Sequence, residues 1–146
     1  MTVEIRPEDY DPWVELSRYQ ARSDRLQPGA FGACASFVGT MRDFSEGDNV
    51  SSMTLEYYPG MTEKQLNDLV EGAIANHELI DALILHRVGE VRPGDAIVLV
   101  ATWSAHRKAS FDACRLIMEH LKSQAPFWKK EQLSDSERWV ESNTSG

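Results

Sequence analysis

Three lysines gather around a proline and two aromatic residues near the C-terminal end of a sequence that is acidic overall. Lys122, Lys129 and Lys130 flank the segment "APFW", residues 125–128, although the 146-residue chain carries 23 Asp and Glu against 15 Lys and Arg. A lysine beside apolar rings and other cations has a lowered pKa, which makes its amine useful as a base, a nucleophile or an anion clamp. The alternative is a helix C-terminus that carries lysines because the helix dipole favours cations there.

The segment "SAHRK", residues 104–108, offers a second place for an anion. It lies where a predicted strand passes into a predicted helix, and the unpaired N–H groups of a helix's first turn bind anions. His106 adds a hydrogen-bond donor whose charge changes near neutral pH. Arg107 adds a planar guanidinium that can donate two parallel hydrogen bonds to a phosphate or carboxylate. The alternative is that Arg107 and Lys108 are solvated surface residues. Arg42 lies at the end of a predicted strand. It either faces a ligand or is a solvent-exposed surface residue.

These two groups lie near opposite ends of one predicted helix. At 1.5 Å per residue, His106 and Lys122 are roughly 24 Å apart, too far to hold the same small ligand. They therefore serve different sites, or one site is built from two chains. A two-fold dimer that pairs the start of this helix with the end of its mate satisfies the second arrangement, which we favour.

Other chemically active residue types have a simpler structural interpretation. His86 and Arg87 lie inside a predicted strand, where at least one of them should face inward and be hydrogen-bonded for structural reasons. Cys34 and Cys114 fall among small or apolar residues, which is typical of core cysteines rather than nucleophiles. The four histidines lack metal-ligand spacing, and no phosphate-loop, dinucleotide or serine-hydrolase motif is present, so no cofactor or metal is expected.

Hydrophobic periodicity and turn signals predict the helices and strands that carry these residues. The sequence predicts strands at 2–6, 28–42, 53–58, 82–88 and 95–103, helices at 11–22 (N-cap Asp11), 62–77 (N-cap Thr62) and 106–123 (capped by Ser104), a polar loop at 43–52, and a strand pair in 127–133 and 137–141. The last helix should bury Ser110, Cys114, Ile117, Met118 and Leu121. Strand pairs interleaved with helices and joined by short turns indicate an α+β fold with a largely antiparallel sheet.

Composition limits the classes of function. The length fits one domain, expected over residues 1–141, with a polar tail at 142–146 that frays. A formal net charge of −8 argues against nucleic-acid binding, which needs a broad basic face. The longest apolar run, residues 96–103, is far too short to cross a membrane, and no signal peptide is recognisable. Two isolated cysteines fit a reducing cytoplasm.

Five segments together resemble a known family. "FVGTMRD", "LEYYPGMTEK", "HRVGEVRPGD", "SAHRKASFDAC" and "LKSQAPFWKKE" are similar to the signature blocks of the MoaE family, the large, catalytic subunits of molybdopterin synthase. The blocks occur in the family's order, and the resemblance runs from about Gly32 to Val140.

This resemblance implies an α/β-hammerhead fold and a sulfurtransferase of molybdenum cofactor biosynthesis. The family inserts two sulfurs into cyclic pyranopterin monophosphate (precursor Z) to make the dithiolene of molybdopterin. The sulfur arrives as a thiocarboxylate on the C-terminal Gly-Gly of a small ubiquitin-like subunit of the MoaD type. Two large subunits form a homodimer that carries one small subunit at each end, giving a heterotetramer. The substrate pocket includes residues of both large subunits, in agreement with the helix-length argument.

The resemblance also implies roles for individual residues. The catalytic residues it indicates are Lys122 and Lys129, and the substrate-binding residues are Thr40, Met41, Arg42, His106, Arg107, Lys122, Lys129, Lys130 and Glu131. Thr40 stands where many relatives have lysine, so one positive charge near the substrate is missing here. Arg138 matches a recurring basic position and is expected to support the site.

Two other classes of function remain as alternatives. One is an enzyme that acts alone on a carbonyl or phosphate ester, with Lys122 forming a Schiff base; it predicts borohydride trapping and no protein partner. The other is an adaptor that binds the glycine tail of a ubiquitin-like protein without chemistry; it predicts tail binding without pterin binding, and indifference to His106→Ala.

Overall fold

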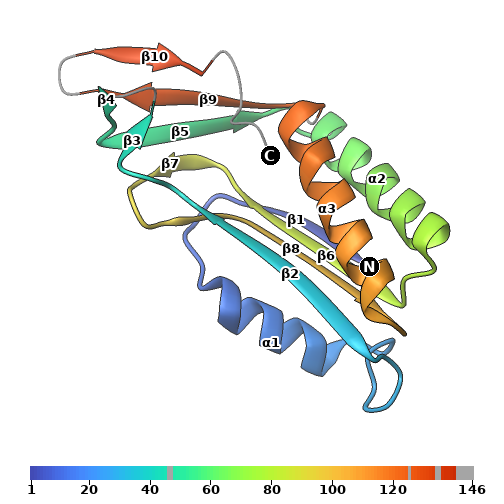
Figure 1. Ribbon diagram of the computed structural model, residues 1–146. Coiled ribbons are helices and arrows are strands. Elements are labelled where there is room, and N and C mark those ends of the chain that lie inside the picture. The colour runs from blue at the N-terminus through green and yellow to red at the C-terminus, as the bar shows by residue number, and fades with distance from the viewer. Residues whose placement is uncertain (46–47, 125, 134–135, 141–146) are drawn as a thin grey trace.

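The computed structural model describes residues 1–45, 48–124, 126–133 and 136–140. These residues form three helices, two four-stranded sheets and a small two-stranded hairpin (Figure 1). The tail expected to fray, residues 142–146, lies outside the described residues. Within the described part of the chain, no helix is both long enough and apolar enough to cross a membrane.

The first sheet has the strand order β1 (Thr2–Arg6), β6 (Asp81–Arg87), β8 (Ala96–Ser104) and β2 (Ala33–Thr40). β1 runs parallel to β6, and the other neighbouring strands are antiparallel. The central strands β6 and β8 are almost entirely buried, which explains their near-continuous apolar and β-branched sequence.

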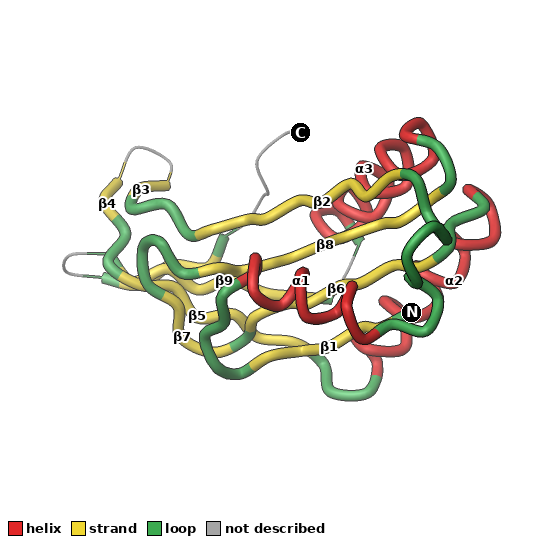
Figure 2. The backbone as a smooth tube through the Cα atoms, turned by 90° about the horizontal axis from the view of Figure 1, so that it is seen from below, coloured by secondary structure: helices red, strands yellow, loops and turns green. Residues whose placement is uncertain are grey.

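Helices cover both faces of this sheet. α2 (Met61–His77) and α3 (Arg107–Ser123) pack on one face, and α1 (Pro12–Arg22) packs on the other (Figures 1 and 2). Because side chains alternate along a strand, β6 contributes to both layers: Ile84 packs with α2 and α3, and Leu83 packs on the α1 side.

The second sheet lies beyond one end of the first. Its strand order is β10 (Glu137–Trp139), β9 (Phe127–Gln132), β5 (Ser52–Tyr57) and β7 (Gly89–Val91), and all its neighbouring strands are antiparallel. The hairpin of β3 (Phe44–Ser45) and β4 (Asp48–Asn49) falls within the segment predicted to be a polar loop. The strands are therefore largely antiparallel, as predicted. They form two four-stranded sheets, however, where the sequence predicts a single sheet.

The helix boundaries follow the predicted ranges, but two predicted caps are wrong. Asp11 caps α1 as predicted, accepting hydrogen bonds from the N–H groups of Trp13 (2.9 Å) and Val14 (3.2 Å). Thr62 does not cap α2, because its hydroxyl is buried and donates to the carbonyl of Pro126 (3.1 Å). Gly60 takes that position at φ 85°, a conformation that glycine adopts without strain.

The start of α3 also differs from the prediction. His106 is the N-cap residue, and Ser104 instead donates its hydroxyl hydrogen to the carbonyl of His106 at 2.6 Å. The predicted strand at 28–42 is shorter, because the chain turns at residues 27–30, where the N–H of Ala30 donates to the carbonyl of Gln27 (2.9 Å). The buried face predicted for α3 is confirmed in full.

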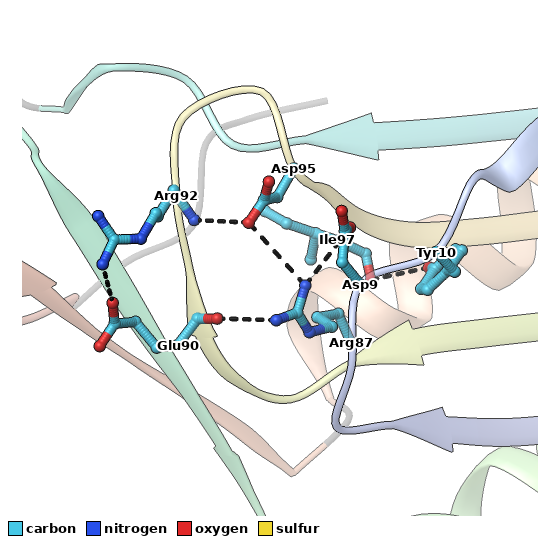
Figure 3. Close-up of polar contacts among 7 residues, drawn as sticks. All are labelled: Asp9, Tyr10, Arg87, Glu90, Arg92, Asp95 and Ile97. Carbon is cyan, nitrogen blue, oxygen red and sulfur yellow. Dashed lines mark hydrogen bonds and ion pairs between the residues drawn. The ribbon is translucent and has the colours of Figure 1, made fainter.

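Arg87, at the end of β6, ties the turn between β7 and β8 to the start of the chain (Figure 3). Its guanidinium donates to the carbonyl of Glu90 at 2.9 Å and pairs with the carboxylates of Asp9 (3.5 Å) and Asp95 (3.9 Å). Asp95 also accepts a hydrogen bond from the backbone N–H of Arg92 (2.9 Å). This network fixes the end of β6, which forms part of the pocket described next.

Candidate active site

A pocket of about 340 Å³ opens where the C-terminal end of α3 meets the start of β9. Helix α3 and the second sheet form its walls, and the ends of β2, β6 and β8 form its floor. The lining residues are Phe37, Gly39, Thr40, Arg42, His86, Ile97, Val98, Met118, Leu121, Lys122, Phe127 and Lys129. Four of the residues expected at the site therefore line one cavity: Thr40, Arg42, Lys122 and Lys129.

A row of paired residues across the first sheet makes the floor. His86 lies opposite Val98, and Val98 lies opposite Gly39. A Cβ atom added to Gly39 would lie 3.0 Å from Cγ1 of Val98 and 3.2 Å from Cε1 of Phe37. The missing side chain at Gly39 therefore lets the aromatic ring of Phe37 lie along the pocket.

Lys122 and Lys129 reach the pocket from different elements. Lys122 lies in the last turn of α3, and Lys129 lies in β9. Burial, together with the charge of Lys122 and a side-chain hydrogen bond with it, lowers the pKa of Lys129 to about 8. A lysine with this pKa exchanges its proton near neutral pH, which suits general acid–base catalysis.

The chain after β2 brings Arg42 and Thr40 to the pocket and turns Met41 away from it. The N–H of Met41 donates to the carbonyl of Asp95 (3.0 Å), and the carbonyl of Met41 accepts from the N–H of Gly94 (2.9 Å). The Met41 side chain is 5% exposed and packs in the core beneath the second sheet. Among the three residues expected to contact substrate here, Met41 thus lies in the core and positions its neighbours.

His86 occupies the floor beside the lysines. Its ring stacks on Phe127, with centroids 3.7 Å apart and 11° between the planes. The stack joins β6 of the first sheet to β9 of the second. Burial lowers the pKa of His86 to about 4, and the charges of Lys129 and Lys122 also lower it. The imidazole is therefore neutral at physiological pH.

The other charged residues of β9 and β10 pair with one another. Glu131 is 5% exposed and accepts a hydrogen bond from Nε of Arg138 at 2.9 Å. Its charge raises the pKa of Lys129, against the larger lowering by burial. Lys130, which alternation places on the opposite face of β9 from Lys129, pairs with Glu137 at 2.8 Å. Glu131 and Arg138 therefore form a pair on the same face of β9 as Lys129, and Lys130 contacts the acidic side chain of β10.

Comparison with known proteins places the chain in a family. Residues 12–124 match the family described as MoaE protein. The chain is also 48% identical over 144 residues to the molybdopterin synthase catalytic subunit of Ralstonia nicotianae, across 99% of this chain and 79% of that relative. The chain belongs to the MoaE family. A second relative, the molybdopterin synthase catalytic subunit of Pseudomonas aeruginosa, is 44% identical over 145 residues, covering 99% and 93% of the two chains.

Solved structures of the MoaE family have the same fold. The MoaE protein from Burkholderia ambifaria superposes with a TM-score of 0.79 and 42% identity, covering 99% of this chain and 92% of the other. Molybdopterin synthase from Staphylococcus aureus superposes with a TM-score of 0.80 and 28% identity, covering 94% and 95%. The α+β fold predicted from the sequence is thus confirmed.

Two residues expected at the site of this MoaE chain lie far from the pocket. His106 and Arg107 are exposed at the N-terminal end of α3, and Lys122 is near its C-terminal end. Over 16 residues, the rise of an α-helix separates His106 from Lys122 by roughly 24 Å, as the sequence predicts. A single chain does not bring the two groups together.

Sequence reasoning did not place His86 in the pocket and did not predict its contact with Phe127. The sequence predicts a structural, hydrogen-bonded role for at least one of His86 and Arg87, and it predicts that the proline and aromatic residues near Lys129 exclude water and give a pterin a surface to pack on. The position of His86 could have been predicted in part. Alternation along β6 puts its side chain on the same face as Ile84, which belongs to the core, and two residues closer to the end of the strand. The stack on Phe127 could not be predicted, because it depends on how two separate sheets meet.

Proposed function

We propose that this chain is the catalytic subunit of a molybdopterin synthase. In this proposal it transfers sulfur from the thiocarboxylated C-terminus of a small ubiquitin-like subunit to cyclic pyranopterin monophosphate, forming the dithiolene of molybdopterin. Membership of the MoaE family and the names of its relatives support the reaction class. The single structural observation that carries it is the convergence of Lys122 and Lys129 on one pocket.

The charges of the pocket suit this reaction. Both reactants are anionic, one a phosphorylated pterin and the other a thiocarboxylate. Arg42, Lys122 and Lys129 supply positive charge in a cavity whose apolar lining, including Met118 and Leu121, excludes water. Fixed cations in such a site stabilise developing negative charge far better than they would in water.

The two lysines have distinct roles in this proposal. Lys122 assists attack of the thiocarboxylate sulfur on the pterin side chain, by proton transfer or by transient bonding to the carbonyl. Lys129, with its lowered pKa, stabilises negative charge and exchanges a proton near neutral pH. The neutral ring of His86 adds no further positive charge to the pocket.

We further propose that the complete site needs two copies of this chain. His106 and Arg107 at the start of α3 form an anion-binding end without a pocket of their own, and Lys122 lies at the other end of the helix. A two-fold dimer brings the start of α3 of one copy to the pocket of the other. The phosphate of the pterin would then bind His106 and Arg107, and its reacting carbons would lie near Lys122.

The proposed partner is a small sulfur-carrier subunit at each end of that dimer, giving a heterotetramer. The proposed location is the cytoplasm, where reducing conditions keep Cys34 and Cys114 as the free thiols that the structure has.

A reconstituted sulfur-transfer reaction tests the function. Purified protein is mixed with the thiocarboxylated small subunit and cyclic pyranopterin monophosphate, and the dithiolene product is measured as its oxidised fluorescent derivative. Product should form only when all three components are present. A protein that binds the small subunit but makes no product would instead be an adaptor. Borohydride trapping of a small carbonyl compound on Lys122, without any partner, would favour a Schiff-base enzyme.

A further inference from the structure

The hydrogen bonds of the His86 ring determine which of its nitrogens carries the proton. Nδ1 lies 2.8 Å from the carbonyl oxygen of Arg87. A carbonyl oxygen can only accept, so the hydrogen is on Nδ1 and the lone pair of the neutral ring is on Nε2. The Arg87 carbonyl is itself well fixed, because the Arg87 guanidinium is tied to Glu90, Asp9 and Asp95 (Figure 3).

The orientation of the ring is fixed as well. Phe127 lies flat against it at 3.7 Å, and the side chain of His86 is buried on the pocket floor. Burial and the charges of Lys129 and Lys122 hold the pKa of His86 at about 4, so the ring stays neutral. An acceptor held this rigidly has little rotational freedom to lose when a ligand binds.

The remaining polar side chains of the pocket are mostly donors. Arg42, Lys122 and Lys129 carry N–H groups, and a guanidinium or an ammonium has no lone pair to offer. At pH 7, where Lys129 is mostly protonated, the described side chains that line the cavity offer a lone pair chiefly at the Thr40 hydroxyl and at Nε2 of His86. Among these side chains, His86 and Thr40 are therefore the acceptors that a ligand's N–H group can use, while the cations bind its anionic group.

We propose that Nε2 of His86 accepts a hydrogen bond from a ring N–H of the bound heterocycle, which makes His86 a specificity-determining residue. This inference rests on the proposed function in naming the heterocycle as a pterin, whose pyrimidine ring carries an amide N–H and an amino group. The cations of the pocket select the phosphate and thiocarboxylate, and His86 selects the ring. An analogue whose ring lacks N–H groups loses this hydrogen bond.

A comparison of two ligands and two proteins tests the inference. The ligands are 6-hydroxymethylpterin and its analogue methylated on N3 and doubly on the 2-amino group, which has no ring N–H donor. The proteins are the wild type and His86→Phe, whose ring can still lie against Phe127. Affinities are measured by titrating the pterin's fluorescence, and thermal unfolding checks that both proteins fold. His86→Leu replaces His86→Phe if the latter does not fold.

The pterin should bind roughly ten-fold more weakly to His86→Phe than to the wild type, because its donor is left unpaired. The methylated analogue should bind the two proteins equally, whereas a merely structural role would weaken both ligands alike. In turnover, KM for the natural substrate should rise while kcat changes little. Equal losses for the two ligands would overturn this inference alone. Wild-type protein that bound neither ligand but formed dithiolene from the natural substrate would overturn this inference alone, and protein that did neither would overturn the proposed function with it.

Discussion

The ring of His86 lies flat against the ring of Phe127, and this contact joins the two sheets at the floor of the pocket. Phe127 begins β9, and Lys129 follows two residues later on the same face of that strand. The position of the reactive amine therefore depends on an aromatic contact between strands that are distant in sequence.

Replacement of Phe127 should disturb the pocket more than replacement of its neighbour Trp128. Phe127→Ala removes the ring that covers His86, so we expect a loss of about 2–3 kcal/mol in the free energy of unfolding. With less burial, the pKa of His86 should rise from about 4 toward its ordinary value of 6.5. Urea unfolding and an NMR titration of the imidazole measure the two effects.

Trp128→Ala is the matched control for this experiment. Trp128 is 43% exposed, and its ring meets Tyr58 edge-on rather than lining the pocket. Its removal should leave the His86 titration unchanged and keep sulfur transfer within a few-fold of wild type. If both variants shifted the His86 titration equally, the stack would not be the cause.

The charge on Lys129 opposes folding at neutral pH. Because its pKa falls from 10.5 to about 8 on folding, the unfolded chain binds more protons between these pH values, and stability rises with pH through that window. Lys129→Met should therefore stabilise the protein at pH 7 by on the order of 2 kcal/mol, allowing for partial exposure. Sulfur transfer should fall by on the order of 10²-fold.

Urea unfolding at pH 7 and pH 9.5 checks this dependence, since the advantage of Lys129→Met should shrink at the higher pH. The control is Lys64→Met, at an exposed lysine of α2 that pairs with Asp68 at 2.9 Å. Its effect should stay within about 0.5 kcal/mol at both pH values. A stabilisation by Lys129→Met that did not depend on pH would show that its amine is not buried as described.

The pair formed by Arg138 and Glu131 should support the pocket through stability. Arg138→Ala leaves a buried carboxylate unpaired, so a loss of about 2–3 kcal/mol is expected. Adding Glu131→Gln to that variant removes the charge and should restore part of the loss. A double-mutant cycle by urea unfolding measures the coupling, and strictly additive losses would argue against the pair.

Mixing two inactive variants tests whether the site is shared between chains. His106→Ala and Lys122→Ala should each be nearly inactive alone. When the two are unfolded together and refolded, half of the dimers are mixed, and each mixed dimer has one intact site. Activity should recover to about a quarter of wild type. No recovery, with mixed dimers present, would place His106 and Lys122 in the same chain's site or in separate sites.

The sequence predicts the elements well because local signals determine them. Asp11 and Pro12 mark the start of α1, and the spacing from Ser110 to Leu121 correctly predicts the buried face of α3. Gly60 was missed as a cap because Thr62 is the residue type usually found there, and tertiary contacts with Pro126 override that preference.

The candidate site could be predicted only in part. Lys122, Lys129 and Arg42 are recognisable by residue type, position and family resemblance, and the structure brings them to one pocket. Met41 is expected there for the same reasons, but it lies just beyond β2, where backbone hydrogen bonds to Asp95 and Gly94 hold it with its side chain in the core. The place of His86 in the pocket depends on the register of three strands and on how the two sheets meet. No local sequence pattern contains that information.

We propose that the pocket at the end of α3 carries out sulfur transfer with Lys122. Single-turnover dithiolene formation is therefore measured for Lys122→Ala beside Lys64→Ala, which removes an exposed lysine of α2. Lys122→Ala should form product on the order of 10²–10³-fold more slowly, with its unfolding temperature and small-subunit binding unchanged. Lys64→Ala should match the wild type. Near-normal turnover by folded Lys122→Ala would contradict the account.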